Sequence, residues 1–211
     1  MFDAATKFIR TGLLALGLIV PAGMAQAQNL ASLPRQGAAA QAVGEARPMA
    51  AWVAFCQRVP SECAVNPSEP ATVPLSPRVW GAINTVNRRV NDTIQPVTDE
   101  EHWGIADRWD IPTDGRGDCE DFQLLKRKIL AEQYGVPRRA MRMTVVIDRE
   151  GEGHAVLIVR TDRGDFVLDN KTNAVRPWFE TGYVYVKRES QDRIGWVSLG
   201  RATSPAVTAN W

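Results

Sequence analysis

Apolar residues recur at every third or fourth position in two segments of the chain, and this spacing predicts two amphipathic helices. The first runs from Pro77 to about Ile94, because a proline suits the first helical position and Pro96 bars continuation. The second begins after Asp118, which is a good N-cap residue. It ends before Gly135, a residue type that favours the C′ position just beyond a helix.

Beyond the second helix the apolar period changes to two, which predicts β-strands. Short polar turns connect the first three of them, so we expect an antiparallel meander. Helices followed by several antiparallel strands indicate an α+β domain. The predicted strands are Met141–Ile147, Gly153–Arg160 and Asp165–Asp169, with Tyr183–Lys187 and Ile194–Leu199 as candidates for two more.

The first residues have the pattern of an export signal. Lys7 and Arg10 precede an apolar run over residues 13–20, and residues 25–27 (Ala-Gln-Ala) have the A-x-A form of a cleavage site. The run is shorter than the ~20 residues that a transmembrane helix needs. We therefore expect residues 1–27 to be a cleaved signal peptide; an uncleaved membrane anchor is the alternative.

Composition divides the rest of the chain. Residues 28–48 are rich in Ala, Gln, Gly and Pro without an apolar period, which predicts a flexible lead-in. Residues 49–211 have a length that suits one domain, and prolines within residues 67–77 predict an irregular extended link. Hydrophobic residues make up 45% of the chain, which is enough apolar material for a core.

Charge excludes one class of partner. The chain carries 25 Lys and Arg against 24 Asp and Glu, a formal net charge of +1, and the basic residues form no block. Proteins that bind nucleic acid usually show a basic patch or stripe. We therefore expect no nucleic-acid partner.

The three cysteines have different predicted roles in an oxidising compartment. Cys56 and Cys63 lie close enough in sequence to close a small loop by a disulfide, with two buried thiols as the alternative. Cys119 is left over, and an odd cysteine in an exported protein is either a partner for another chain or a reactive thiol. Its place at the start of the second helix favours reactivity, because the helix dipole and unpaired N–H groups stabilise a thiolate.

A reactive cysteine needs a base, and the chain contains only His102 and His154. His154 begins an apolar strand, a rigid platform for an oriented imidazole, whereas we expect His102 to be a surface or structural residue. Asp169 ends the next strand and is the candidate to hold the other ring nitrogen. Ordinary structural roles for Cys119, His154 and Asp169 are the alternative.

The predicted register leaves a gap between this acid and the base. A tight turn over residues 162–164 places Asp169 opposite residue 157 or 158, roughly 10–13 Å along the strand from His154 at about 3.3 Å per residue. A bulge or a longer turn is needed to close it.

Three carboxylates flank the candidate nucleophile: Asp118, Glu120 and Asp121. Together they raise the pKa of the Cys119 thiol unless something neutralises them. Two arrangements resolve the conflict. The acids either face away as cap and first-turn residues, or they bind Ca²⁺, which prefers clustered carboxylate oxygens.

Three sequence blocks, in this order, resemble those of the bacterial transglutaminase-like cysteine proteinases. Separations of 35 and 15 residues between the candidate Cys, His and Asp make the combination specific. The likeness runs from about residue 50 to 187. The blocks are Gly117–Phe122 with Lys126, Gly153–Leu157 and Val167–Asn170; upstream, Asn87, Asn91, Asp107, Trp109 and the segment from Phe55 to Cys63 also fit.

The resemblance implies a papain-like, transglutaminase-like α+β fold whose triad is Cys119, His154 and Asp169. It also implies Ca²⁺ bound by acidic residues beside the nucleophile, which are Asp118, Glu120 and Asp121 here. The Cys119 backbone N–H and a donor from the preceding tryptophan loop are candidates to hold an oxyanion. Trp109 is the candidate to line that site, with a plain core role as its alternative.

The best-studied members of that family are periplasmic proteases that cut a large surface adhesin and release cells from biofilm. An inner-membrane receptor for cyclic-di-GMP holds them in check. The function predicted for this chain is therefore that of a periplasmic cysteine endopeptidase. An acyl transferase or cross-linking enzyme with the same triad is one alternative, and a non-catalytic exported domain that binds Ca²⁺ is the other.

Overall fold

The computed structural model describes Met1 and residues 33–208. The signal peptide predicted at residues 1–27 lies, except for Met1, outside the described residues. All elements below belong to the compact unit that begins at Leu33. Within the described ranges, no helix is long and apolar enough to cross a membrane.

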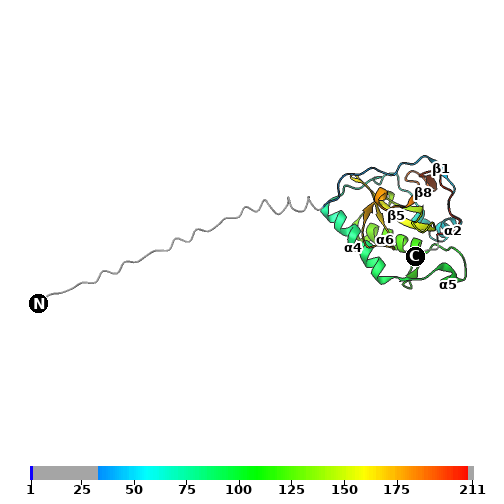
Figure 1. Cartoon of the computed structure of the whole chain (residues 1–211), viewed down its shortest axis with the longest axis horizontal. Coiled ribbons are helices and arrows are strands. Elements are labelled where there is room, and N and C mark those ends of the chain that lie inside the picture. Colours follow the sequence, from blue (N-terminus) through cyan, green and yellow to red (C-terminus); the bar gives the residue numbers. More distant parts are fainter. Residues whose placement is uncertain (2–32, 209–211) are drawn as a thin grey trace. The chain divides into compact units, whose positions relative to one another are not determined.

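The unit is built on one seven-stranded sheet in which all neighbouring strands are antiparallel (Figure 1). The order across the sheet is β1 (Gly44–Ala46), β9 (Trp196–Ser198), β8 (Val184–Glu189), β4 (Met141–Ile147), β5 (Gly153–Thr161), β6 (Gly164–Leu168) and β7 (Arg176–Pro177). The expected meander is present as β4–β5–β6. The two later strands do not extend it: β8 pairs with the other edge of β4, and β9 pairs with β8.

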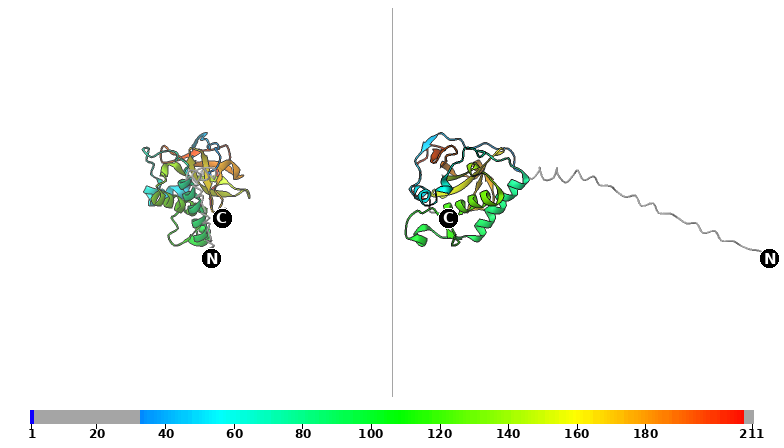
Figure 2. Two further views of the ribbon diagram at one scale, coloured as in Figure 1. Left: turned by 90° about the vertical axis from the view of Figure 1, so that its left-hand side faces the viewer. Right: turned by 180° about the vertical axis from the view of Figure 1, so that it is seen from behind.

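Two long helices cover the sheet and form the core with it (Figure 2). Helix α6 (Cys119–Tyr134) packs on β5, and helix α4 (Pro77–Thr93) packs on α6. Both match the predicted segments. Helix α4 begins where the Ser76 side chain accepts a hydrogen bond from the Val79 amide at 3.2 Å, and α6 ends at Gly135 with φ of 68°. The predicted α+β class is therefore confirmed.

Shorter elements connect these parts. A parallel pair of two-residue strands, β2 and β3, lies beside α5 at the start of α6. The bounds are α2 (Ala50–Arg58), α3 (Pro60–Cys63), β2 (Gln95–Pro96), α5 (Asp99–Trp103) and β3 (Arg116–Gly117), with single 3₁₀ turns η1 (Arg138–Ala140) and η2 (Trp178–Glu180).

The predicted disulfide is present and joins Cys56 at the end of α2 to Cys63 in α3, with 5.6 Å between the Cα atoms. It closes the turn between the two short helices. Arg127 of α6 also contacts this turn and donates a hydrogen bond to the Glu62 carbonyl at 2.8 Å. The Arg127 guanidinium also pairs with Glu189 of β8 at 2.7 Å. A buried ion pair thus ties the disulfide turn to both α6 and the sheet.

The lead-in expected to be flexible over residues 28–48 differs in its described part. Residues 44–46 form β1 against β9, and the Ala40 amide donates to the buried Asp165 carboxylate at 2.9 Å. Leu33 and Ala40 are buried. Edge pairing with a distant strand thus orders residues 44–46, which lie in a segment that has no apolar period of its own.

Candidate active site

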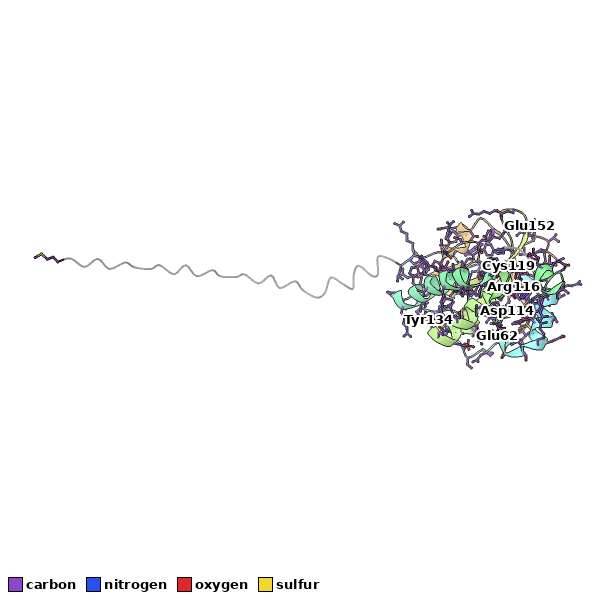
Figure 3. The ribbon with its side chains drawn as sticks, turned by 90° about the horizontal axis from the view of Figure 1, so that it is seen from below. Glu62, Asp114, Arg116, Cys119, Tyr134 and Glu152 are labelled. Atoms are coloured by element: carbon purple, nitrogen blue, oxygen red, sulfur yellow. A yellow bond between two sulfur atoms is a disulfide. The ribbon has the colours of Figure 1, made fainter. Side chains whose placement is uncertain are left out.

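Helix α6 places Cys119 beside the first residues of strand β5. Cys119 is the first residue of the helix and its side chain is fully buried (Figure 3). Its Sγ atom accepts a hydrogen bond from the Ala155 amide at 3.3 Å. Ala155 directly follows His154 on β5, so the candidate nucleophile contacts the backbone of the strand next to the candidate base.

His154 and Asp169 are joined by a direct hydrogen bond. The His154 Nε2 atom lies 2.9 Å from Asp169 Oδ1, and both side chains are buried. The other ring nitrogen, Nδ1, has no hydrogen-bond partner among the described residues. With Nε2 held by the carboxylate, Nδ1 is the nitrogen that remains to exchange a proton with a thiol.

The Asp169 carboxylate is held ionised. Burial alone would raise its pKa, but the hydrogen bond and charge of His154, together with the hydrogen bond of Tyr183, lower the pKa to about 2. An ionised Asp169 accepts a hydrogen bond from the Nε2–H group and stabilises an imidazolium.

The offset between Asp169 and His154 along the paired strands is smaller than predicted. Leu157 pairs with Leu168. If the register continued, Asp169 would lie opposite residue 156 and not opposite 157 or 158. Pairing ends at Leu168, and no bulge or longer turn was required. The remaining offset of two residues corresponds to about 7 Å at 3.3 Å per residue. The side chains of His154 and Asp169 span this distance, because Asp169 lies beyond the paired part of β6.

Two asparagines of α4 hold the segment that follows β6. Asn87 accepts from the Asp169 amide at 3.2 Å, and it donates to the Thr172 carbonyl at 3.0 Å. Asn91 donates to the Asp169 carbonyl at 2.9 Å. Their spacing of four residues puts both on one face of the helix. They therefore position the acid through its backbone.

Tyr183 completes the surroundings of the acid, and the sequence analysis missed it. Its hydroxyl donates to Asp169 Oδ2 at 2.7 Å, and its ring lies edge-on to His154 with 5.8 Å between centroids. Burial and the neighbouring Asp169 charge raise the pKa of Tyr183, so it stays a donor. Tyr183 lies just before β8, and no local pattern marks it.

Replacing Tyr183 with Phe removes this donor and keeps the ring. We expect kcat to fall roughly 3–10-fold, equivalent to about 1 kcal/mol of lost positioning, with KM little changed. The pKa of Asp169 should rise, because one of the contacts that lower it is gone. Acid unfolding then begins at a higher pH.

Tyr185→Phe is the matched control for this prediction. The Tyr185 hydroxyl bonds Thr181 at 3.1 Å, away from the triad candidates. It should leave kcat unchanged. Equal losses in the two variants would mean that Tyr183 has only a structural role.

An acidic cluster surrounds the N-terminus of α6. Ligand oxygens of Asp99, Asp118 and Asp121 lie within 4.8 Å of one another, as do those of Asp99, Asp107 and Glu120. Burial, followed by the charge of Asp99, raises the pKa of Asp107 to about 7. Burial, followed by the charges of Cys119 and the neighbouring carboxylates, raises the pKa of Glu120 well above its ordinary value. Five carboxylates therefore share one buried region.

The predicted trio is thus gathered rather than facing away. Asp118 is the N-cap residue of α6, as predicted, but its side chain makes no cap hydrogen bond and instead accepts from the Asp99 amide at 3.3 Å. Asp121 accepts from the Asp110 amide at 2.7 Å. Glu120 lies beside the thiol, with Oε2 3.2 Å from Cys119 Sγ.

Oxygens in this cluster fit a hard cation. Asp107 Oδ1, Asp118 Oδ1 and Glu120 Oε1 are buried and have no hydrogen-bond partner within the described part of the chain. Unpaired buried carboxylate oxygens are costly, and a divalent cation satisfies them. In the sequence, Asp107 fits the family pattern but has no feature that marks it as a metal ligand, and Asp99 has the pattern of an ordinary first-turn acid of α5.

Two other residues singled out in the sequence make packing contacts. The Trp109 side chain is fully buried and packs edge-on against Trp196 with 6.0 Å between centroids; its site-lining role stays a prediction. His102 stacks on Trp103 and bonds the exposed Asp114 at 2.8 Å, in line with the expected structural role.

The sequence was compared with models of known protein families, and one of them matches most of the chain. The model of the bacterial transglutaminase-like cysteine proteinases (BTLCP) matches residues 42–204. The chain belongs to this family. It is therefore a transglutaminase-like cysteine peptidase, and its substrate is a protein. The comparison with curated proteins returned no match.

A solved structure shares the fold of this proteinase, and two related structures are similar to it. Calcium-bound LapG of Legionella pneumophila is 23% identical, with a TM-score of 0.50, and the match covers 61% of this chain and 74% of that one. LapG of the same organism, without a stated ligand, is 24% identical over 57% and 68%, with a TM-score of 0.48. An EGTA-treated form is 24% identical over 57% and 67%, also with a TM-score of 0.48.

Proposed function

We propose that this proteinase is a periplasmic endopeptidase in which Cys119 is the nucleophile, His154 the base and Asp169 the residue that orients the base. One observation carries the proposal. His154 is bound to Asp169 through Nε2 at 2.9 Å, and the next residue on the strand donates its amide to Cys119 Sγ at 3.3 Å.

The mechanism follows from these contacts. His154 Nδ1 takes the thiol proton, and Sγ attacks the peptide carbonyl carbon to form a tetrahedral intermediate. Collapse of the intermediate leaves a thioester on Cys119, while His154 gives its proton to the departing amine. Water, deprotonated by His154, then hydrolyses the thioester. Throughout, the ionised Asp169 keeps the proton of Nε2 in place and stabilises the imidazolium.

The acidic cluster supports a second part of the proposal, a resident Ca²⁺. The residues that would hold it are Asp99, Asp107, Asp118, Glu120 and Asp121. When bound, the cation supplies positive charge that offsets the carboxylates beside the nucleophile. The calcium-bound state of the LapG structure agrees with this assignment.

Calcium should stabilise the folded protein. At a concentration of 100 times Kd, binding adds about 2.7 kcal/mol, which corresponds to a melting temperature roughly 5–10 °C higher than in EGTA. Differential scanning calorimetry in the two buffers measures the shift, with Mg²⁺ in a third sample.

Matched aspartate variants make this test specific. Asp118→Asn removes a cluster carboxylate and should lose the calcium-dependent shift. Asp165→Asn changes a buried aspartate that binds the Ala40 amide far from the cluster, so it should lower the melting temperature in both buffers and keep the shift. A shift retained by Asp118→Asn would argue against the cluster as the calcium site.

Substrate, compartment and regulator are proposed on the family resemblance. A large surface adhesin would be the protein substrate, cleavage would release cells from biofilm, and an inner-membrane receptor for cyclic-di-GMP would control access. The disulfide between Cys56 and Cys63 supports an oxidising compartment such as the periplasm.

Acyl transfer is the second candidate, because it shares the thioester intermediate with hydrolysis. Protein substrate is incubated with the mature proteinase, with and without an added primary amine, and new termini are identified by mass spectrometry. Hydrolysis predicts free carboxyl termini in both samples, whereas amide products would favour the transferase. Failure of iodoacetamide to abolish product formation would refute a thiol mechanism of either kind.

A further inference from the structure

The end of the described chain lies on the candidate active site. After β9 the chain continues to Thr208, whose side chain is fully buried. Its backbone carbonyl accepts a hydrogen bond from Cys119 Sγ at 2.5 Å, and its hydroxyl donates to Glu120 Oε2 at 3.4 Å. Thr208 also lies against Asp107, whose pKa its polar groups lower.

The preceding tail residues cross the start of β5. A side chain added at Gly153, directly before His154, would place its Cβ 2.7 Å from Pro205 Cβ and against the Val207 carbonyl oxygen. Only a glycine leaves room for the tail here. The segment of residues 204–208, which we call the C-terminal tail, therefore contacts both the nucleophile and the strand that carries the base.

These contacts place the tail directly against the candidate nucleophile. The Thr208 carbonyl oxygen lies 2.5 Å from Cys119 Sγ, and Glu120 Oε2, which the Thr208 hydroxyl also contacts, lies 3.2 Å from the same sulfur. His154 Nδ1 is buried and has no hydrogen-bond partner among the residues described. A peptide carbonyl of the tail therefore lies at the thiol, which is where the carbonyl of a substrate must approach.

We propose that the peptide-binding cleft at Cys119 takes the protein's own C-terminal tail as an intramolecular ligand, which a substrate must displace. The proposal rests on the proposed function, since it names what fills the proposed catalytic cleft before substrate binds. The occupant is part of the same chain and makes hydrogen bonds to Cys119 and Glu120, with a passage past Gly153 that excludes a side chain.

The tail contact is suited to displacement. The Val207 side chain is 40% exposed, and the tail residues form no strand with the sheet. Such a ligand binds because it is tethered, which makes its local concentration about millimolar or higher. A protein substrate that makes more contacts in the cleft can replace it.

Alkylation of Cys119 by iodoacetamide tests the proposal without requiring catalysis. The other two cysteines form the disulfide, so the reaction reports on one thiol of the described chain. If the tail covers the thiol in about 90% of molecules or more, displacing it raises the alkylation rate about 10-fold or more. Mass spectrometry of the mature full-length protein gives the rate.

Thr208→Trp displaces the tail in the otherwise complete chain, because the indole does not fit a fully buried threonine site. Val207→Trp is the matched control, with the same bulk added at an exposed neighbour. We expect fast alkylation in the first and the wild-type rate in the second. A chain ending at Thr203 should behave like Thr208→Trp; if that shortened chain does not fold, the full-length pair decides.

A peptide added in trans tests the cleft itself. The probe is a capped peptide with the sequence of residues 202–208, Ala-Thr-Ser-Pro-Ala-Val-Thr, at millimolar concentration, with a scrambled peptide as its control. It should slow alkylation of Thr208→Trp toward the wild-type rate. Equal rates in all of the proteins, or no protection by the peptide, would overturn the proposal.

This outcome is separable from a failure of the proposed function. Rapid alkylation of Thr208→Trp that is unaffected by His154→Gln, without proteolysis, would leave the tail proposal standing and refute the Cys–His pair. Active proteolysis with equal alkylation rates in all variants would support the Cys–His pair and refute the tail proposal.

Discussion

Replacing Cys119 with Ala is expected to reduce proteolysis by about 10⁴-fold or more, because no other group in the site can form the thioester. Cys119 is the only cysteine of the described chain outside the disulfide, and it begins the helix that faces His154. The fold should change little, since Ala fills most of the same buried space. The measurement is kcat/KM on a protein substrate, together with the melting temperature.

The double variant Cys56→Ser with Cys63→Ser is the control for general effects of losing cysteine. It removes the disulfide and should lower stability by about 2–3 kcal/mol, as expected for a short closed loop, while kcat of the folded protein stays near the wild-type value. Full activity of Cys119→Ala would contradict the nucleophile assignment. A large loss of kcat in the double variant would show that the assay responds to stability.

Replacing Asp169 with Asn is expected to lower kcat/KM by about 10²–10⁴-fold. The carboxylate accepts a hydrogen bond from Nε2–H of His154 at 2.9 Å, and this contact leaves the Nδ1 lone pair for the thiol. An amide can donate to Nε2 as well as accept from it, which allows the wrong tautomer. Most of the loss should appear in kcat, since Asp169 holds the base and does not bind the substrate.

The same substitution changes how stability depends on pH. The pKa of Asp169 is lowered from 3.8 to about 2 in the folded protein, so its ionised form stabilises the fold at pH above about 4. That contribution, about 2 kcal/mol, is lost as pH falls from about 4 to about 2. Denaturation curves of wild type and Asp169→Asn should therefore differ at pH 7 and converge near pH 2.

A buried aspartate elsewhere separates the two effects of this substitution. Asp148→Asn removes another carboxylate whose pKa is lowered, by hydrogen bonds from Lys171 and backbone amides that outweigh burial, without touching His154. It should alter acid stability and leave kcat within a few-fold of wild type. If Asp169→Asn retains full kcat, Asp169 is a structural acid and the mechanism needs another group to orient His154.

Local sequence signals determined the elements that carry the triad candidates. The period of apolar residues, a proline at the start and Pro96 beyond the end define α4, and Gly135 terminates α6. Strand β4 matches its predicted bounds, Met141–Ile147. These signals depend on residues near each other in the chain, so they can be read without a fold. Motif spacing likewise pointed to the family.

Only the tertiary structure decided what gathers around these elements. Asp99 joins the acidic cluster across the β2–β3 pair, Tyr183 reaches Asp169 from the segment before β8, and Thr208 lies on Cys119 from the far end of the chain. It also decided the placement of β8 beside β4, that of β9 beside β8, and the pairing of residues 44–46 with β9. Each of these depends on contacts between residues far apart in sequence, for which no local periodicity exists.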